Sequence, residues 1–284
     1  MTFGFPRRPS AKGLAILALV VVVLFVLVGQ LGKAGSKSGG PGSGAAAPPA
    51  TGPGPTRGPQ GPEQAGEWTF DEGAGRAAAD TAGGNPVALL AGASWDRDGK
   101  AGTAVAFDGT RGYGETSRSV LDTSGSYSVA AWVRLDRVPA GFATAVSQDG
   151  GPDSAFALQY VPSGAWAMSG PSGRALSAYP PVRGQWTHLA GVRDGAAGTW
   201  TLYVDGARTD STPTPSAGSG SAVSSPTSTS SGPTPAGPAG PLAIGRGRSN
   251  GTATAFFPGA VDSVRVYQGA LREEDVLKLY QSGS

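Results

Sequence analysis

Asp262 occupies the most unusual setting of any ionisable side chain in this sequence. It lies in residues 261–267 (VDSVRVY), whose Val and Tyr content predicts a strand. Successive side chains of a strand point to opposite faces, so simple alternation places Asp262 on the same face as Val264 and Val266. A carboxylate on an apolar face needs hydrogen-bond donors or a cation beside it. The sequence therefore predicts a partner for Asp262.

Nucleophilic and acid–base catalysis find little support in the remaining residues. Cysteine is absent, which excludes disulfides, thiolate catalysis and cysteine-bound zinc. His188 is the only histidine, and it alternates with Trp186 and Ala190 in WTHLAG, which favours a buried histidine with satisfied hydrogen bonds over a catalytic base. No nucleophile elbow accompanies it, because the one GxSxG match, GRSNG at 247–251, is not followed by a convincing helix. We therefore predict that the protein is not an enzyme.

Two short motifs match ligand-binding loops only in part. Asp96 and Asp98 in WDRDG start like an acidic calcium loop, but Lys100 stands where the next acidic residue belongs, so a solvated turn is expected. The stretch 245–251 (GRGRSNG) resembles a phosphate loop without its Gly-Lys-Ser or Gly-Lys-Thr end. We interpret it as an exposed hairpin.

The distribution of charge argues against nucleic acid as a partner. The net charge is +2, but six basic residues precede position 66 and face a single acid there. From residue 66 onward the chain carries 16 basic and 19 acidic residues, a net charge of about −3. A basic footprint for nucleic acid is therefore not expected.

The N-terminal residues predict a membrane anchor followed by a linker. Residues 13–32 carry no charge and, as a helix, span roughly 30 Å, the thickness of a bilayer's hydrocarbon core. Basic residues in 1–12 predict a cytoplasmic N-terminus and an extracellular remainder. The alternative is a cleaved secretory signal, which also exports the remainder. Residues 33–66 are rich in Gly, Pro and Ala and are expected to form a disordered linker.

Residues 67–284 have the pattern of an all-β domain. Short runs of Val, Leu, Trp, Tyr and Phe alternate with polar residues and stop at Gly, Asp, Asn or Pro, with turn signals at Asp194-Gly195 and Asp205-Gly206. One short helix is expected at the C-terminus, with Val276, Leu279 and Tyr280 on one face. The low-complexity tract 211–240 has strand-like sequence on both sides and reads as an insertion.

Seven segments of this domain, taken in order, resemble a known family. They are 68–95, 104–115, YSVAAWVRL (127–135), QWTHLAGVRDG (185–195), TLYVDGAR (201–208), PLAIGRG (241–247) and 256–280. Their succession is similar to the laminin-G-like jelly roll of the concanavalin A-like lectin/glucanase superfamily. The resemblance implies a two-sheet antiparallel sandwich in which the first strand, near 68–70, pairs with the last, near 264–267. Arg272 stands where the family has Ser or Thr, so a weaker helix cap is expected.

The same resemblance implies a structural calcium ion between an early loop and the final strand. Calcium prefers six to eight oxygen ligands. The side-chain ligands expected here are Asp80, Asn85 and Asp262, with carbonyl oxygens near Gly83 and Ala260. In the alternative, Asp262 accepts hydrogen bonds from loop amides and Asp80 shapes an Asx turn.

Three functions remain open from the sequence. The first is a membrane-anchored extracellular module that binds glycans or surface proteins without catalysis, with Trp166 and Tyr179 as candidate exposed aromatics for sugar stacking. The second is a polysaccharide-acting enzyme of the superfamily, although the glutamates avoid the middle of the domain. The third is a passive cell-surface domain.

Overall fold

A computed structural model of the protein describes residues 61–213 and 239–283. The chain divides into two units, Met1–Pro55 and Thr56–Ser284. The predicted cytoplasmic segment 1–12, the predicted membrane helix 13–32, most of the predicted linker and residues 214–238 of the predicted insertion lie outside the described residues. In the part of the chain that is described, no helix is both long and apolar enough to cross a membrane.

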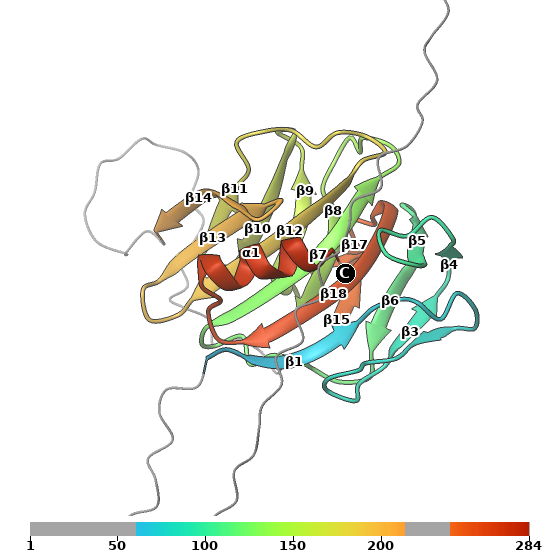
Figure 1. Ribbon diagram of the computed structural model, residues 1–284, viewed down its shortest axis with the longest axis horizontal. Helices are drawn as coiled ribbons and strands as arrows, with labels where there is room; N and C mark the ends of the chain where they lie inside the picture. Colours follow the sequence, from blue (N-terminus) through green and yellow to red (C-terminus); the bar gives the residue numbers. More distant parts are fainter. Residues whose placement is uncertain (1–60, 214–238, 284) are drawn as a thin grey trace, which may run out of the picture. The chain divides into compact units, whose positions relative to one another are not determined.

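The second unit consists of short strands and one C-terminal helix (Figure 1). The strands are β1 (Glu63–Trp68), β2 (Ala77–Ala78), β3 (Val87–Leu90), β4 (Ala93–Asp96), β5 (Ala104–Asp108), β6 (Tyr113–Thr116), β7 (Tyr127–Leu135), β8 (Ala143–Asp149), β9 (Ser154–Val161), β10 (Ala165–Gly170), β11 (Gly173–Leu176), β12 (Trp186–Asp194), β13 (Thr199–Val204), β14 (Ala207–Pro213), β15 (Leu242–Ile244), β16 (Gly247–Ser249), β17 (Thr252–Thr254) and β18 (Pro258–Gln268), and the helix is α1 (Glu273–Ser282).

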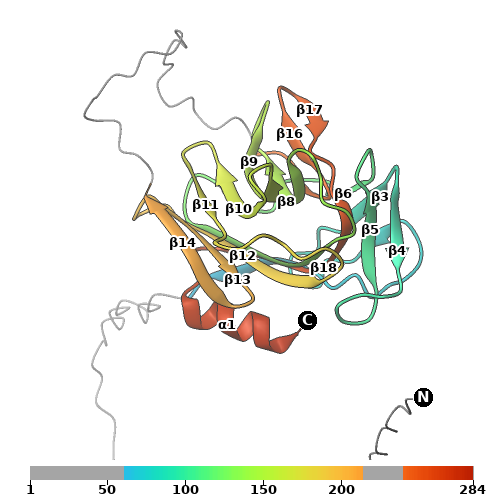
Figure 2. The same cartoon turned by 90° about the horizontal axis from the view of Figure 1, so that it is seen from above.

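Two eight-stranded antiparallel sheets form a sandwich, as the sequence predicted (Figure 2). Sheet A has the order β14-β13-β12-β7-β18-β5-β4, with β1 also paired to β18. Sheet B has the order β11-β10-β9-β8-β15-β6-β3-β2. The β16-β17 hairpin stands on the outer side of sheet B, and α1 covers the outer side of sheet A (Figure 2).

The first and last strands pair, which confirms that prediction. β1 runs antiparallel to β18, with Glu63 opposite Gln268 and Trp68 opposite Val264. β1 begins at Glu63, inside the predicted linker, and its last residue is Trp68 rather than a residue near Phe70. β1 thus ties the start of this unit to its C-terminal strand.

Alternation along β7 shows how these sequences build the core. Tyr127, Val129, Ala131, Val133 and Leu135 all belong to the buried cluster between the sheets. The residues between them face outward from sheet A, where most are covered by α1 and nearby loops. Because β7 lies in the middle of sheet A, nearly all of its side chains are buried on one face or the other.

Asp262 does not share a face with Val264 and Val266, which corrects the prediction from alternation. Ser263 forms a β-bulge with a φ of 49°, and the pairing register with β7 shifts between Asp262 and Arg265. Asp262 lies opposite Trp132 on the outer face of sheet A, whereas Val264 and Val266 belong to the core. The extra residue moves every later side chain of β18 to the other face.

The helix behaves as its sequence predicted. Val276 is fully buried on the outer face of sheet A against Ala190, Val192 and Tyr203, with Leu279 beside it. Arg272 is the N-cap residue and makes no side-chain capping hydrogen bond, so the weak cap is confirmed. The three acidic residues of the first turn complement the helix dipole.

Candidate functional site

The loop around Asp80 is held by hydrogen bonds from backbone amides. Asp80 Oδ1 accepts hydrogen bonds from the amides of Glu67, Ala82 and Gly83 at 2.9 to 3.0 Å, and Oδ2 accepts one from Asn85 at 3.0 Å. Partial burial acts to raise the pKa of Asp80, but these donors together hold it below its usual range. Asp80 therefore fastens its own loop to β1.

Asp262 finds its partners in the loop between β4 and β5. Oδ2 accepts hydrogen bonds from the amides of Lys100 at 2.7 Å and Ala101 at 3.1 Å, and the Ser263 hydroxyl donates to Oδ1 at 3.2 Å. Asp262 is fully buried. Burial raises its pKa to about 6, an effect that the surrounding donors only partly offset.

The remaining predicted calcium ligands are engaged elsewhere. The buried Asn85 donates to the carbonyl of Arg118 at 3.1 Å, and its Oδ1 accepts from the backbone amide and the hydroxyl of Ser117. Ala260 lies inside β18 and is paired on both sides, with Arg134 and Ala106. Its backbone is therefore committed to the sheet.

The side-chain oxygens of Asp80, Asn85 and Asp262 already accept hydrogen bonds from N–H and O–H groups. This arrangement does not match a single cation bound by all three side chains. Asp80 and Asp262 bind different segments, the 80–85 loop with β1 and the 100–101 loop respectively. Within the described residues, no three His, Cys, Asp or Glu side chains gather where they could hold a metal ion. Calcium binding by Asp80, Asn85, Gly83, Ala260 and Asp262 stays a prediction, and the geometry favours the hydrogen-bonded alternative.

Trp166 and Tyr179, the predicted stacking aromatics, meet at one hollow but differ in exposure. Tyr179 is 80% exposed, whereas Trp166 is 2% exposed and packs in the core against Phe257 and Tyr160. The prediction of an exposed side chain is thus wrong for Trp166, because β10 turns it between the two sheets. Both residues line a hollow of about 370 Å³ at one end of the sandwich.

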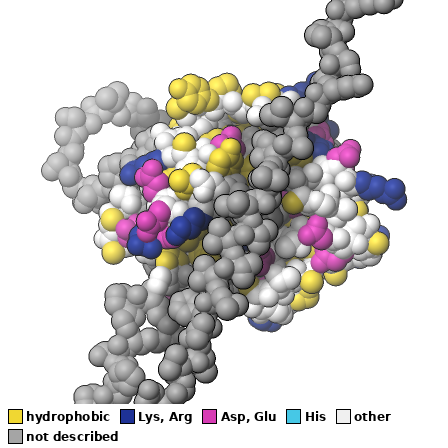
Figure 3. Space-filling view, viewed as in Figure 1, with side chains coloured by type: hydrophobic (Ala, Val, Ile, Leu, Met, Phe, Trp, Pro, Cys, Tyr) yellow, Lys and Arg dark blue, Asp and Glu magenta, His cyan; other side chains and the backbone are white. Residues whose placement is uncertain are grey.

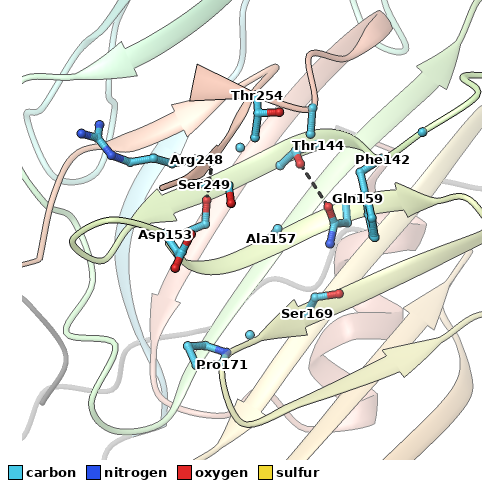
Figure 4. A pocket seen from close by; sticks show the side chains of 15 residues that line it. Phe142, Thr144, Asp153, Ala157, Gln159, Ser169, Pro171, Arg248, Ser249 and Thr254 are labelled. Atoms are coloured by element: carbon cyan, nitrogen blue, oxygen red, sulfur yellow. Dashed lines mark hydrogen bonds between the residues drawn. The ribbon is translucent and has the colours of Figure 1, made fainter. Parts of the chain in front are cut away.

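A larger hollow lies elsewhere, on the outer face of sheet B. It has a volume of about 720 Å³ and is lined by strands β8, β9 and β10, the β16-β17 hairpin and the turns beside them (Figure 4). We call it the sheet B groove. Its lining residues are Gly141, Phe142, Thr144, Asp153, Ser154, Ala157, Gln159, Ser169, Gly170, Pro171, Gly247, Arg248, Ser249, Thr254 and Ala255.

The floor of the sheet B groove carries uncharged polar side chains among small apolar residues, and the polar ones, Thr144, Gln159 and Ser169, are at most 8% exposed. Gln159 Oε1 accepts a hydrogen bond from the Thr144 hydroxyl at 3.2 Å, and the Gln159 amide nitrogen points toward Ser169 (Figure 4). An aromatic side chain, Phe142, stands at one end and is 45% exposed. The arrangement offers one apolar ring and several hydroxyl and amide groups within one concave surface.

Charged side chains at the groove largely neutralise one another. The guanidinium of Arg248 points away from the groove floor (Figure 4) and pairs with Asp149 at 3.1 Å. Arg246, only 3% exposed, binds Asp149 with two hydrogen bonds of 2.9 and 3.0 Å and also reaches Glu115. Asp153 is the one carboxylate that lines the groove.

The hairpin that forms the groove wall is fixed in place. Residues 247–254 form the β16-β17 hairpin, which confirms the predicted hairpin in this stretch. Its turn residue Asn250 has a φ of 49° and donates from its amide to Asp153 at 3.0 Å. Gly251 donates to the carbonyl of Pro152 at 2.7 Å. The hairpin and the β8-β9 turn therefore hold one side of the groove together.

The sequence contained a signal for this groove that alternation alone could have revealed. In β9, Phe156, Leu158 and Tyr160 face the core, so Ala157 and Gln159 must face outward. A small residue and an amide on the outer face leave room for a ligand. The groove itself could not be inferred, because the hairpin that walls it lies much further along the chain.

His188 is buried beneath α1, as predicted, but its Nδ1 has no hydrogen-bond partner among the described residues, so the predicted satisfaction of the ring is not met. Its ring lies 5.2 Å from the ring of Trp132 and 6.0 Å from that of Tyr280, measured between centroids. The ammonium group of Lys100 lies 4.3 Å above the Trp132 ring. Burial, helped by the charge of Arg265, lowers the pKa of His188 to about 4. His188 is therefore neutral at pH 7 and packs in an aromatic cluster.

Comparisons with known proteins agree with the observed sandwich. A family model described as "Concanavalin A-like lectin/glucanases superfamily" matches residues 108–277, more than half of the chain. No curated protein sequence matches.

Several solved structures are similar in fold. Domain 4 of AbnA, a GH43 extracellular arabinanase from Geobacillus stearothermophilus in complex with arabinotriose, has a TM-score of 0.55 at 21% identity, covering 78% of this chain and 100% of that one. Trypanosoma rangeli sialidase in complex with sialic acid has a TM-score of 0.53 at 16% identity, covering 77% of this chain and 33% of that one. The binding domain of botulinum neurotoxin serotype D has a TM-score of 0.56 at 9% identity, covering 78% and 52%. At these identities the similarity shows the fold alone, and the match spans about a third of the sialidase.

Proposed function

Because this chain belongs to the concanavalin A-like lectin/glucanase superfamily, we propose that its folded domain binds neutral oligosaccharides in the sheet B groove and does not hydrolyse them. The observation that carries this proposal is the groove itself, in which a half-exposed aromatic ring stands at one end of a floor that carries hydroxyl and amide groups. Sugar recognition combines these same two elements, stacking on a ring and hydrogen bonds to hydroxyls. The groove's volume of about 720 Å³ is also large enough for several sugar rings.

Four side chains of the groove would contact the sugar directly. Phe142 provides the face on which a sugar ring stacks. The amide nitrogen of Gln159 donates to a sugar oxygen, and the hydroxyls of Ser169 and Thr254 can both donate and accept. Arg248 is already paired with Asp149, whereas the Arg174 guanidinium lies 5.8 Å from the centre of the Phe142 ring and donates to the Ser169 hydroxyl at 3.0 Å, so one cation lies beside the stacking face. Neutral sugars are still the proposed class, because an arginine in this position can donate to the hydroxyls of a neutral sugar.

Binding without catalysis is supported by the carboxylates at the groove. Most glycoside hydrolases use two carboxyl groups that flank the scissile bond. Asp153 is the only one among the lining residues, and its Oδ1 already accepts a hydrogen bond from Asn250. The similar fold of an arabinanase domain that was solved with arabinotriose supports a sugar as the ligand.

The proposed setting is the cell surface. It rests on residues 13–32 as a membrane anchor, with the folded domain outside the cell, or on secretion after cleavage of that segment. The competing functions are binding of a surface protein, enzymatic action on a polysaccharide, and a passive role as a spacer. A sugar-binding titration with the purified domain distinguishes them.

Calorimetric titration of residues 56–284 with arabinotriose and a panel of neutral and acidic oligosaccharides tests the proposal. This fragment contains both sheets, the core and the helix as one compact unit. We expect binding of a neutral sugar, and Phe142→Ala should weaken it about tenfold, since ring stacking contributes roughly 1 kcal/mol beyond the area that it buries.

Tyr179→Ala provides the matched control, because it removes the other candidate aromatic without touching the groove. Loss of binding in Tyr179→Ala but not in Phe142→Ala would move the site to the hollow that Trp166 and Tyr179 line. Release of reducing ends from a polysaccharide would favour the enzyme. No binding across the panel would refute the proposal in favour of a protein ligand or a passive domain.

A further inference from the structure

Large hydrophobic side chains are exposed together at one end of the sandwich. Tyr179, Val182 and Val138 are 80%, 61% and 59% exposed, the three highest values for large hydrophobic residues in the described part of the chain. Together with Pro139, Pro180 and Pro181 they form what we call the apolar edge. In Figure 3, hydrophobic side chains gather along the upper rim, where Figure 1 shows the loops that lead out of β7 and into β12.

Two loops build the apolar edge, and they are fastened to each other. Loop 136–142 joins β7 to β8, and loop 177–185 joins β11 to β12. The side chain of Arg183 donates from Nε to the carbonyl of Asp136 at 2.7 Å, and the amide of Gly184 donates to the carbonyl of Leu135 at 2.8 Å. Prolines further restrict both loops, so little conformational freedom remains to be lost when the edge is covered.

The charges beside the apolar edge are predominantly positive. Arg137 and Arg183 are both exposed, and both guanidinium groups donate to backbone carbonyls. Neither forms a salt bridge with a carboxylate of a described residue. Asp136, the one acidic residue on the two loops, is already paired with Arg134 at 2.8 Å. The edge therefore presents apolar side chains flanked by two cations.

We propose that the apolar edge docks on an anionic lipid bilayer. Val138 and Val182 would enter the boundary between headgroups and acyl chains, and Tyr179 would lie at the level of the headgroups, where an aromatic ring with a polar end is favoured. The guanidinium groups of Arg137 and Arg183 would bind lipid phosphates. The edge consists of loop tips beside the hollow of about 370 Å³ that Tyr179, Pro180, Pro181 and Val182 line, and its exposed apolar side chains with two cations beside them suit the interface of an anionic bilayer.

This inference is independent of sugar binding. The residues of the apolar edge do not line the sheet B groove, so either site can fail while the other remains. Phe142, which lies on the same loop as Val138, belongs to the groove and is left unchanged in the tests below.

Vesicle co-sedimentation of residues 56–284 tests the proposal, with vesicles of phosphatidylcholine alone or mixed with phosphatidylglycerol. We expect binding to the anionic vesicles that weakens as salt is added. The double variant Val138→Ser/Val182→Ser should bind at least about tenfold more weakly, because two apolar side chains lose their transfer into the bilayer. Leu277→Ser is the matched control: it removes another exposed apolar residue, on α1, and should bind as the wild type does.

Site-specific labelling reports insertion directly. The chain has no cysteine, so Val182→Cys and Leu277→Cys each give a single attachment point for an environment-sensitive nitrobenzoxadiazole dye. Anionic vesicles should shift the emission of the dye at position 182 to shorter wavelength and leave the dye at 277 unchanged. Absence of vesicle binding would overturn the proposal and favour a protein as the occupant of the edge. Equal binding to neutral vesicles would refute the choice of an anionic bilayer, and equal shifts at both positions would refute docking through this edge.

Discussion

Replacement of Asp262 by Asn should change the way in which stability depends on pH. The carboxylate is fully buried on the outer face of sheet A, and burial raises its pKa from 3.8 to about 6. A raised pKa means that the folded state binds the proton more tightly than the unfolded state does. The stability contributed by this group is therefore complete below about pH 3.8 and is lost as the pH rises through about 6.

The size of the effect follows from that shift. One pKa unit corresponds to about 1.4 kcal/mol, so ionisation of Asp262 reduces the free energy of unfolding by about 3 kcal/mol between pH 3 and pH 8. An asparagine at this position would carry no charge at any pH, and its side-chain oxygen can still accept from the amides of Lys100 and Ala101. The Asp262→Asn variant should therefore gain about 3 kcal/mol relative to the wild type across this interval.

Urea unfolding of residues 56–284 at several pH values from 3 to 8 measures this difference. For a domain of this size, 3 kcal/mol corresponds to a change in Tm of roughly 6 to 12 °C. Asp98→Asn removes an exposed carboxylate from the adjacent loop and controls for the change in net charge. A stability difference between Asp262→Asn and the wild type that stays constant with pH, or that falls as the pH rises, would refute the reasoning.

Three further predictions concern the same domain. Asp149→Ala should reduce the free energy of unfolding by about 3–5 kcal/mol in urea titrations, because it leaves the Arg246 guanidinium buried without its main partner; a loss below about 1 kcal/mol would contradict this. The Tm of the domain, measured by calorimetry, should be the same with calcium as with a chelator, because Asp80 and Asp262 already accept hydrogen bonds from amides. A higher Tm in calcium that is lost in Asp80→Asn would instead support the predicted calcium site. Ser263→Val should lower stability by about 1–3 kcal/mol relative to Ser263→Gly, because only glycine adopts a φ of 49° without strain; equal stabilities would show that the bulge relaxes.

Much of the fold could be predicted because its signals are local. The alternation in residues 127–135 is determined within β7, and the Asp205-Gly206 turn needs only the two residues that adopt positive φ. The pairing of the first and last strands was predicted from the family resemblance and is confirmed by the register between β1 and β18. These features depend on neighbours in sequence or on a shared architecture.

The candidate sites were harder to predict because burial depends on residues far along the chain. Trp166 is surrounded by Gly, Ser and Ala in the sequence, yet Phe257 and Tyr160 cover it in the core. Arg246 lies in a stretch that reads as an exposed loop, yet Asp149 and Glu115 come from β8 and β6 to bind it. A single sequence does not reveal which distant strand will cover a given side chain.

By itself, the sequence determined that this chain carries an all-β sandwich closed by a C-terminal helix, and that Asp262 is a buried carboxylate in need of a partner. The tertiary structure decided which face Asp262 occupies. β18 pairs along one edge first with β5, over residues 258–261, and then with β1, over residues 264–268. The bulge at Ser263 lies where one neighbour gives way to the other. The change of register in β18 depends on its pairing with β1, β5 and β7, so it cannot be predicted from alternation within β18 alone. This change turns Asp262 away from the core and toward the amides of Lys100 and Ala101.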